Sequence, residues 1–388
     1  MPVFYLILFF TTIVSFFGYY IKSKRRVVGD FSIFDYESQR YYKSVPLLFA
    51  FATFFVMLYF VCYRSNYGDT WLYVSTFENA TSNLSYIKKI IDSDSDCKGY
   101  DILLVLFKHY ISDDYSVWFT FLALFSSGAF IKLYYQHSIN FAMSSFLFIT
   151  SGTFTWLMNG VRQFFAVCII IYGFNYIIDR KFFRFFILVL LATTIHYTAI
   201  IWIPVYFIVV LKPWSKGIWL CIAITILIIL GIDQFTSFLD DSLEGTAFEG
   251  AGTAINSYTF EDGSVDDGVN PIRVLIAAVP AIIAFWRRKY VDEYGDLVIN
   301  ICVNLSVVAT GVYLLGMATS GIMIGRLPIY FTLTNYVLLP WLLDKVFEGK
   351  FKVFMKVMCY LCYFIYFYYA YNIQRAGYYG SEKLGLFC

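Results

Sequence analysis

The fold is decided by one stretch of the chain, which begins NGVRQFF (159–165), continues through DRKFFRFF (179–186) and ends LLATTIHYTAIIWIPVYFIVVL (190–211). Arg162 lies at the start of one apolar run, and His196 lies in the middle of the next. Charged and titratable groups are costly in a bilayer, and those that occur there usually mark a functional site. The stretch therefore predicts membrane-spanning helices that carry such a site.

The composition of the whole chain agrees with this interpretation. Its 388 residues are 60% hydrophobic and only 14% charged, whereas a soluble domain is about half apolar and about a quarter charged. No polar stretch is long enough for a separate soluble domain, so we expect a single membrane domain over residues 1–388. No basic face with interleaved aromatic residues suits nucleic acid, and no nucleotide-binding motif is present. We therefore expect no cofactor and no nucleic-acid partner.

A membrane-spanning helix needs about 20 apolar residues, and the chain contains many runs near that length. Lys and Arg favour the cytoplasmic side, so KSKRR (22–26) and RRK (287–289) place the N-terminus outside. Counting residues 183–211 as one or two crossings gives about 11–12 transmembrane helices and an all-α, polytopic fold. The other expected spans are residues 3–21, 45–63, 116–134, 140–158, 161–178, 217–232, 272–286, 297–317, 327–344 and 353–371.

Residues 183–211 leave two topologies open. A single helix of these 29 residues would be about 43 Å long, and it would put the later basic clusters on the wrong sides. If the chain instead folds back near TTIHYT (193–198), every basic cluster lies inside. We prefer the fold-back, which places His196 below the outer surface, at the floor of a cavity. Irregular backbone at that depth must be buried in protein or line water.

Two outer loops are predicted. The first, residues 64–115, contains DILLVLFKHYI (101–111), which is too short to cross the membrane and is expected to lie at its interface. The second, residues 233–271, contains nine acidic residues and no Lys or Arg. A loop of this length is usually functional or disordered, so it is either a mobile lid or a solvated acidic loop.

The predicted topology brings several ionisable residues to the outer side of the membrane. A single arginine there usually extends its charged end to the interface. Several together are harder to explain in that way, because a guanidinium binds phosphate oxygens in pairs and stays charged. The group therefore suggests a site for a lipid diphosphate. Its members are Arg64, Asp69, Arg162, His196, Arg273 and Arg326.

Two of these residues have alternative roles, and a third, Arg162, has a defined position. Gly68 permits a tight turn before Asp69, which could pair with an arginine, orient a substrate hydroxyl or act as a base. Arg162 follows the Asn159-Gly160 turn, so it lies in the first turn of its helix, where backbone amides also favour phosphate. His196 is either a general base at neutral pH or a buried structural hydrogen-bonding group.

The cysteines give weaker indications. Cys359 and Cys362 form a C-x-x-C motif inside an apolar span, but no second Cys or His pair completes a metal site. We therefore expect no metal there. Cys97 and Cys388 are both expected outside the membrane, where a disulfide between them is possible in an oxidising compartment.

At these positions the sequence resembles the EpsG family, a branch of the Wzy-like polysaccharide polymerases. The resemblance covers about residues 1–375, and one departure from it is SNYGDT (65–70), where the family more often has a shorter valine-glycine-threonine-aspartate run. The motifs that carry it are R-x-x-x-G-D-T-x-x-Y (64–73), G-V-R-Q-x-x-A (160–166), I-H-Y-T-A (195–199) and G-R-x-x-x-Y-F (325–331).

The resemblance implies a fold like that of the multi-span glycosyltransferases (GT-C type) and a polymerase on the outer, periplasmic face of a bacterial inner membrane. Such an enzyme moves a growing glycan from undecaprenyl diphosphate to a sugar hydroxyl of another lipid-linked unit, to make O-antigen, capsule or exopolysaccharide. A chain-length regulator protein would be a possible partner. No metal is needed if arginines neutralise the diphosphate.

Roles for individual residues follow from this reaction. Arg162 and Arg273 would hold the diphosphate, with Arg64 and Arg326 assisting. His196 or Asp69 would accept the proton of the acceptor hydroxyl. Gln163 and Tyr73 would support these groups.

Three other functions fit parts of the sequence. A polysaccharide ligase would transfer finished glycan once instead of building a ladder of lengths. A membrane O-acyltransferase would use the recessed histidine but would leave the outer arginines without a role. A lipid-linked sugar flippase or transporter would need access from both faces, whereas the ionisable residues gather on one side.

Overall fold

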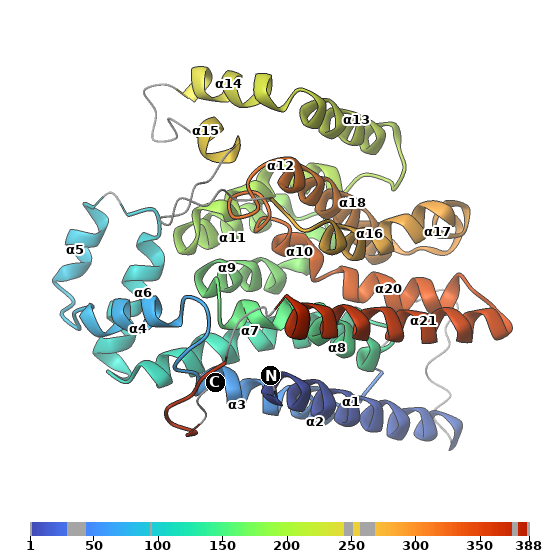
Figure 1. Ribbon diagram of the computed structural model, residues 1–388, viewed down its shortest axis with the longest axis horizontal. Helices are drawn as coiled ribbons and strands as arrows, with labels where there is room; N and C mark the ends of the chain where they lie inside the picture. Colours follow the sequence, from blue (N-terminus) through green and yellow to red (C-terminus); the bar gives the residue numbers. More distant parts are fainter. Residues whose placement is uncertain are drawn as a thin grey trace. The chain divides into compact units, whose positions relative to one another are not determined.

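In the computed structural model the chain is almost entirely helical. The structure describes residues 2–28, 44–93, 95–243, 251–256, 268–374 and 379–385, and their β pairing is one isolated antiparallel bridge between Asn66 and Gly380. The predicted all-α class is therefore confirmed (Figure 1). The chain divides into two compact units, which are described separately below. Unit 1 is Met1–Ile203 with Leu343–Cys388, and unit 2 is Pro204–Leu342.

Among the described residues, four helical segments are long and apolar enough to span a membrane alone. They are Pro2–Lys22 within α1 (Pro2–Val28), α7 (Tyr115–His137), α18 (Leu297–Ala318), and Gly349–Ile373, which joins α21 (Gly349–Tyr368) to a π-helical turn. A fifth results if α13 (Lys216–Leu230) and α14 (Ile232–Leu243), bent by 94° at Gly231, count as one span. These helices identify a multi-pass membrane protein, as the composition predicts.

The remaining expected spans are helical too, but most are interrupted. Each predicted run contains one or two shorter apolar helices, separated by turns such as those at Gly152 and Gly173. The count of about 11–12 crossings, and the side on which each loop lies, therefore stay predictions. The helices concerned are α2 (Leu47–Ala52), α3 (Phe55–Cys62), α8 (Phe141–Thr150), α9 (Val161–Tyr172), α10 (Phe174–Ile178), α16 (Pro271–Trp286), α19 (Ile329–Thr332) and α20 (Asn335–Lys345).

The predicted break in residues 183–211 is confirmed. Helix α11 (Phe182–Ile195) ends at His196, whose backbone is extended, and a 3₁₀ turn then leads into α12 (Trp202–Val209). The rings of Phe185 and Trp202 lie 5.5 Å apart. Ten residues of helix separate Phe185 from Ile195, a rise of about 15 Å, so the chain must turn back after Ile195 to make this contact. We call residues 193–198 the hairpin tip.

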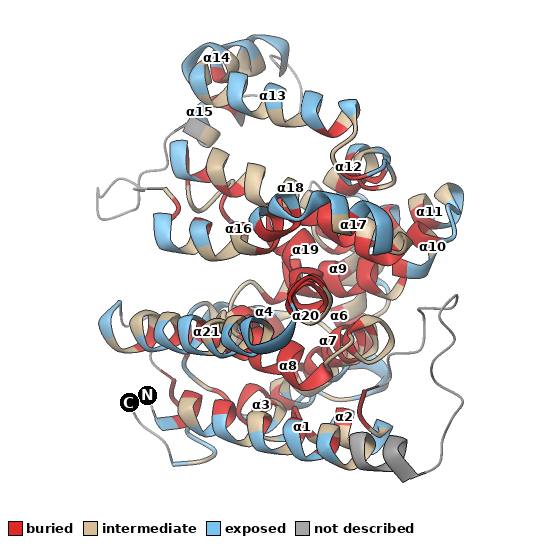
Figure 2. Cartoon of the chain, turned by 90° about the vertical axis from the view of Figure 1, so that its right-hand side faces the viewer, coloured by how far each residue is buried: buried red, intermediate tan, exposed pale blue. Residues whose placement is uncertain are grey.

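The core of unit 1 is built from apolar helices around α7. Figure 2 shows that α7, α8 and α9 are largely buried, whereas α1 has a long exposed face. Trp118 of α7 is fully buried; its ring stacks on that of Phe77 and meets that of Phe107 edge to face. These two phenylalanines belong to α4 (Thr70–Asn79) and α6 (Lys98–Tyr110), so aromatic packing joins these two helices to α7.

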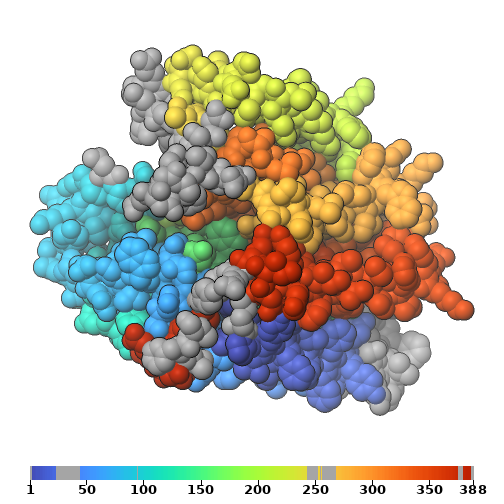
Figure 3. Space-filling model, in the orientation of Figure 1, coloured from blue at the N-terminus to red at the C-terminus, as the bar shows by residue number. Residues whose placement is uncertain are grey.

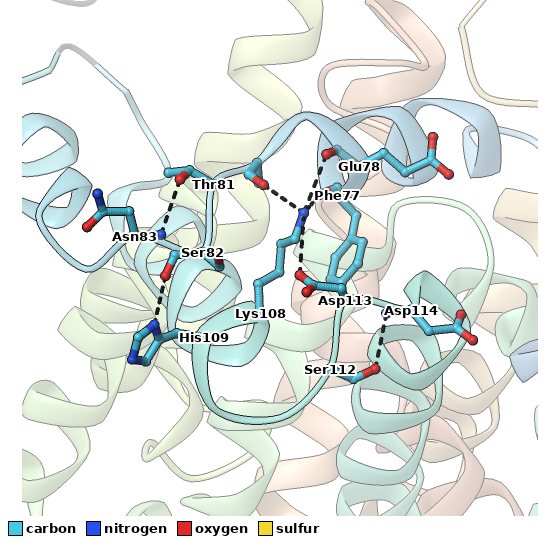
Figure 4. A network of polar contacts seen from close by, with 11 residues as sticks. Phe77, Glu78, Thr81, Ser82, Asn83, Lys108, His109, Ser112, Asp113 and Asp114 are labelled. Carbon is cyan, nitrogen blue, oxygen red and sulfur yellow. Dashed lines mark hydrogen bonds and ion pairs between the residues drawn. The ribbon is translucent and has the colours of Figure 1, made fainter.

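The segment 64–115, predicted to be the first outer loop, contains three helices: α4 (Thr70–Asn79), α5 (Tyr86–Ile91) and α6 (Lys98–Tyr110). The amphipathic stretch predicted at 101–111 thus forms most of α6. Lys108 of α6 donates to the carbonyls of Phe77 and Ala80, at 2.9 and 2.7 Å, and so caps the C-terminal end of α4 (Figure 4). This bond network ties α4 to α6, while the position of α6 at a membrane interface stays a prediction.

Unit 2 is organised around α18, which packs against α16, α13 and α19. The described part of the acidic segment 233–271 is helical, in α14 and α15 (Ala251–Asn256). Asp240 accepts hydrogen bonds from the amide of Gly252 and the hydroxyl of Thr253, at 2.6 and 2.7 Å, and so joins these helices. The other residues of the predicted lid, 244–250 and 257–267, lie outside the described residues, as does Cys388 of the predicted disulfide.

Candidate functional site

Arg162 lies where the sequence placed it, in the first turn of a helix. Gly160 has a φ of +75°, which glycine adopts without strain, and α9 starts at the next residue. The turn thus favours a glycine at this position. It also places Arg162 at the N-terminal end of the helix, where the backbone amides have no partner within the helix. The neighbouring Gln163 is buried.

Two tyrosines, from α4 and α6, hold the Arg162 guanidinium. Its Cζ atom lies 5.8 Å from the ring centre of Tyr73 on α4 and 5.5 Å from that of Tyr100 on α6. Arg162 is half-buried, and no carboxylate of the described residues pairs with it within 4.0 Å. Aromatic rings therefore orient the cation without neutralising it, which leaves its charge available to an anion.

The loop that carries Asp69 packs against the turn before Arg162. Gly68 has a φ of +48°, and a Cβ atom there would lie 2.8 Å from Cγ of Asn159, so only glycine permits this approach. Burial raises the pKa of Tyr73; Arg162 opposes this effect and the charge of Asp69 adds to it. Asp69 and Arg162 therefore both act on the same tyrosine.

The hairpin tip that carries His196 docks against the start of α6. A Cβ atom at Gly99 would lie only 2.1 Å from Oγ1 of Thr194. Burial raises the pKa of the Cys97 thiol, and the nearby backbone of Tyr197 opposes this effect. His196 is half-buried, with Nδ1 2.7 Å from Oγ1 of Thr198. Because α6 also provides Tyr100, one helix end contacts both the hairpin tip and Arg162.

Arg64 differs from Arg162 because it is only 1% exposed. Its Nη1 donates to the Val61 carbonyl at 2.6 Å, its Nε donates to Thr70 at 3.2 Å, and the guanidinium lies 4.0 Å from the ring centre of Phe119. Its Nη2 has no hydrogen-bond partner among the described residues. Burial lowers the pKa of Arg64 to about 10, so the side chain stays charged at neutral pH.

Arg273 and Arg326 belong to unit 2. Arg273 lies in the first turn of α16, 5.5 Å from the ring centre of Tyr313. Arg326 is exposed and follows Gly325, where a Cβ atom would lie 2.4 Å from Val269. Val269 lies just before α16, so both arginines belong to the same end of unit 2, which we call the unit 2 arginine end.

The structure thus divides the predicted site residues into two groups. We call the first the Arg162 site; its members, all in unit 1, are Arg64, Asp69, Tyr73, Arg162, Gln163 and His196. Sequence reasoning missed Cys97 and Tyr100, because their contacts with Arg162 and the hairpin tip join distant parts of the chain. Gly99 between them was the signal that could have been noticed, since a glycine early in a helix often marks close packing.

Comparison with known proteins gives one match. The sequence matches the EpsG family over residues 47–381, which includes all four motifs. No curated protein and no solved structure gives a match.

Proposed function

The chain belongs to the EpsG family, and from that premise we propose that it is a membrane polymerase that joins undecaprenyl-diphosphate-linked oligosaccharide repeat units into a polysaccharide. Family membership suggests a glycosyltransferase-like polymerase acting on lipid-linked oligosaccharides in a membrane. The observation that supports the finer proposal is the Arg162 guanidinium, which Tyr73 and Tyr100 hold without a carboxylate partner among the described residues. We place the reaction on the outer face of a bacterial inner membrane.

The proposed reaction displaces a lipid diphosphate. The hydroxyl oxygen of the acceptor sugar forms a bond to the anomeric carbon of the growing glycan, and the bond from that carbon to the diphosphate oxygen breaks. The electron pair of that bond stays on the diphosphate, so negative charge grows there. A fixed guanidinium next to this charge stabilises the transition state more than the ground state. We assign this task to Arg162.

The hydroxyl proton needs an acceptor, and we assign it to His196 or Asp69. His196 lies on the hairpin tip, which contacts the helix that carries Tyr100. Asp69 is partly exposed and, although it precedes α4, its side chain makes no capping hydrogen bond to that helix. An imidazole and a carboxylate can each serve as a general base, so substitution is needed to choose between them.

The other arginines receive different parts in this proposal. Arg64 is buried and its donors are directed inward, so we assign it to positioning of the loop that carries Asp69. Arg273 and Arg326 form an anion-binding end in unit 2. Each reaction joins two lipid-linked units, and each unit carries a diphosphate, so a second set of cations has a substrate to bind.

The test is the glycan pattern on a gel from cells that carry wild type, a deletion, Arg162→Ala, His196→Ala or Asp69→Asn. We expect the deletion and Arg162→Ala to reduce a ladder to a single repeat unit, and one of the other two variants to do the same. The protein must still be present in the membrane. A ladder that survives Arg162→Ala would reject the assignment, and a ladder that only loses acyl groups in the deletion would favour an acyltransferase.

A further inference from the structure

We propose that residues 379–385, which we call the C-terminal tail, are a positioning strap that holds the loop before Asp69 in the geometry needed for glycosyl transfer. The proposal rests on the function proposed above and extends it to residues far from the site in sequence. In Figure 3 the tail is the red patch at the lower left, next to blue and teal atoms of unit 1. Its contacts are with the two chain segments that surround Arg64.

The first contact is made by the backbone. The amide of Gly380 donates to the carbonyl of Asn66 at 2.8 Å, and the carbonyl of Gly380 accepts from the amides of Ser65 and Asn66 at 2.9 and 3.1 Å. This is the isolated antiparallel bridge of the described residues. It fixes the loop between Arg64 and Asp69 through main-chain atoms, three residues before Asp69.

The second contact closes the end of α3. The hydroxyl of Tyr379 donates to the Phe60 carbonyl at 2.8 Å, and the hydroxyl of Ser381 donates to the Tyr63 carbonyl. Carbonyls in the last turn of a helix lack partners within the helix. Arg64 donates to the Val61 carbonyl of the same turn. The tail and Arg64 thus cap one helix end together, and loss of the tail would leave the buried Phe60 carbonyl unpaired.

The third contact reaches the start of α7. Nζ of Lys383 lies 3.5 Å from Oδ2 of Asp114, and it also donates to Ser116. Asp114 is the N-cap of α7, which carries Phe119 beneath the Arg64 guanidinium. The tail therefore connects the end of α3 to the start of α7, and Arg64 contacts both of these helices.

The placement of these contacts explains why the tail should matter for the reaction. Asp69 and Tyr73 follow the bridged residues directly, and Tyr73 holds Arg162. A shift of about 1 Å in groups that orient a reaction can cost about a hundredfold in rate. A tail that fixes the loop therefore fixes the distance between the proposed acid-base group and the cation.

A disulfide between Asn66→Cys and Gly380→Cys gives the decisive test. Residues that exchange both backbone hydrogen bonds in an antiparallel pair have Cα atoms about 5.5 Å apart, which suits a disulfide. If the tail is a fixed strap, the oxidised double variant makes the wild-type ladder, and reductant changes nothing. If oxidation removes the ladder and reductant restores it, the tail must move during turnover and the proposal is wrong. Each single variant serves as a control.

Weakening the strap gives the complementary test. We expect Lys383→Met to lower the amount of long chains about tenfold, whereas Lys383→Arg, which keeps the charge, should give the wild-type amount. Glu382→Gln is the control. It should behave as wild type, because Glu382 bonds to Ser65 through its backbone and not its side chain. Membrane levels of the protein are measured in parallel. Equal ladders from all three variants at equal levels would overturn the proposal. If the proposed function itself fails, deletion of the whole chain leaves the ladder unchanged, which is a different result.

Discussion

The Arg162 site and the unit 2 arginine end both place an arginine in the first turn of an apolar helix, but they surround it differently. Arg162 is held by Tyr73 and Tyr100, next to the loop that carries Asp69 and the helix end that holds the hairpin tip. Arg273 lies over one ring, that of Tyr313. Just before its helix, Gly268 packs closely against the backbone of Gly316. The same residue type at the same kind of helix end therefore has two different environments.

The difference shows how the two ends can divide the work. All three histidines of the chain lie in unit 1; they are His109, His137 and His196. Unit 2 therefore has no imidazole of its own that could act as a base. Unit 2 offers cations on a close-packed turn, which suits binding of a phosphate more than proton transfer. We therefore expect chemistry at the Arg162 site and anion binding at the unit 2 arginine end.

The largest effect should separate Arg162 from Arg273. We expect Arg162→Ala to lower polymer formation by about 10²–10³-fold, the usual effect of removing a transition-state donor. Arg273→Ala should reduce it about tenfold, mainly by raising the substrate concentration needed, because uniform binding affects KM more than kcat. Rates with purified protein and lipid-linked repeat units measure both. Equal losses in kcat would abolish the distinction between the two ends.

A second pair of substitutions tests the close contacts behind each end. Gly99→Ala places a methyl group against Thr194, and Gly325→Ala places one against Val269. Overpacking of this kind usually costs about 1–3 kcal/mol. We expect Gly99→Ala to lower kcat, because the hairpin tip moves with His196, and Gly325→Ala to raise KM, because Arg326 moves. Thr194→Ser, which keeps the hydroxyl, is the control for the first. The reverse pattern of kcat and KM would contradict the assignment.

A third prediction concerns the helices that frame the Arg162 site. Lys108 is nearly buried and bonds to carbonyls at the end of α4, as Figure 4 shows. Lys108→Met should lower the free energy of unfolding by about 2 kcal/mol, because hydrogen bonds from a charged donor are lost and carbonyls are left unpaired. Thermal unfolding in detergent measures this change. Lys88→Met, on the neighbouring α5, is the matched control and should leave the melting temperature unchanged.

The smallest effect is a pH dependence at the tail. The Ser116 amide donates to Asp114 at 2.7 Å, and this bond, aided by Lys383, holds the pKa of Asp114 below its ordinary value of 3.8. The folded value lies below the unfolded one, so the interaction stabilises the fold above about pH 4 and is lost as the pH falls through the folded value. We expect the tail to become more sensitive to an acid protease over that range. Asp114→Asn should remove the pH step while leaving the sensitivity at neutral pH only slightly raised.

Much of the fold could be predicted because its signals are local. The lengths of the apolar runs indicated the helices, the Asn159-Gly160 turn placed Arg162 in a first turn, and the basic clusters indicated the break near His196. The interruptions within the other spans were not predicted. They occur at residues such as Gly173, where a leucine side chain packs against the glycine, so the reason lies in a tertiary contact and not in the local run of hydrophobicity.

The sequence by itself determined that this chain is an all-α membrane protein of the EpsG family with arginines at helix starts, because composition, periodicity and turn residues act over short distances. Only the tertiary structure decided which of those groups meet. Arg64 and the tail bond to the same helix end, Tyr100 lies beside Arg162, and Gly99 packs against Thr194 of the hairpin tip. Each of these contacts joins residues far apart in the chain, and the closure of such long loops depends on the whole packed core.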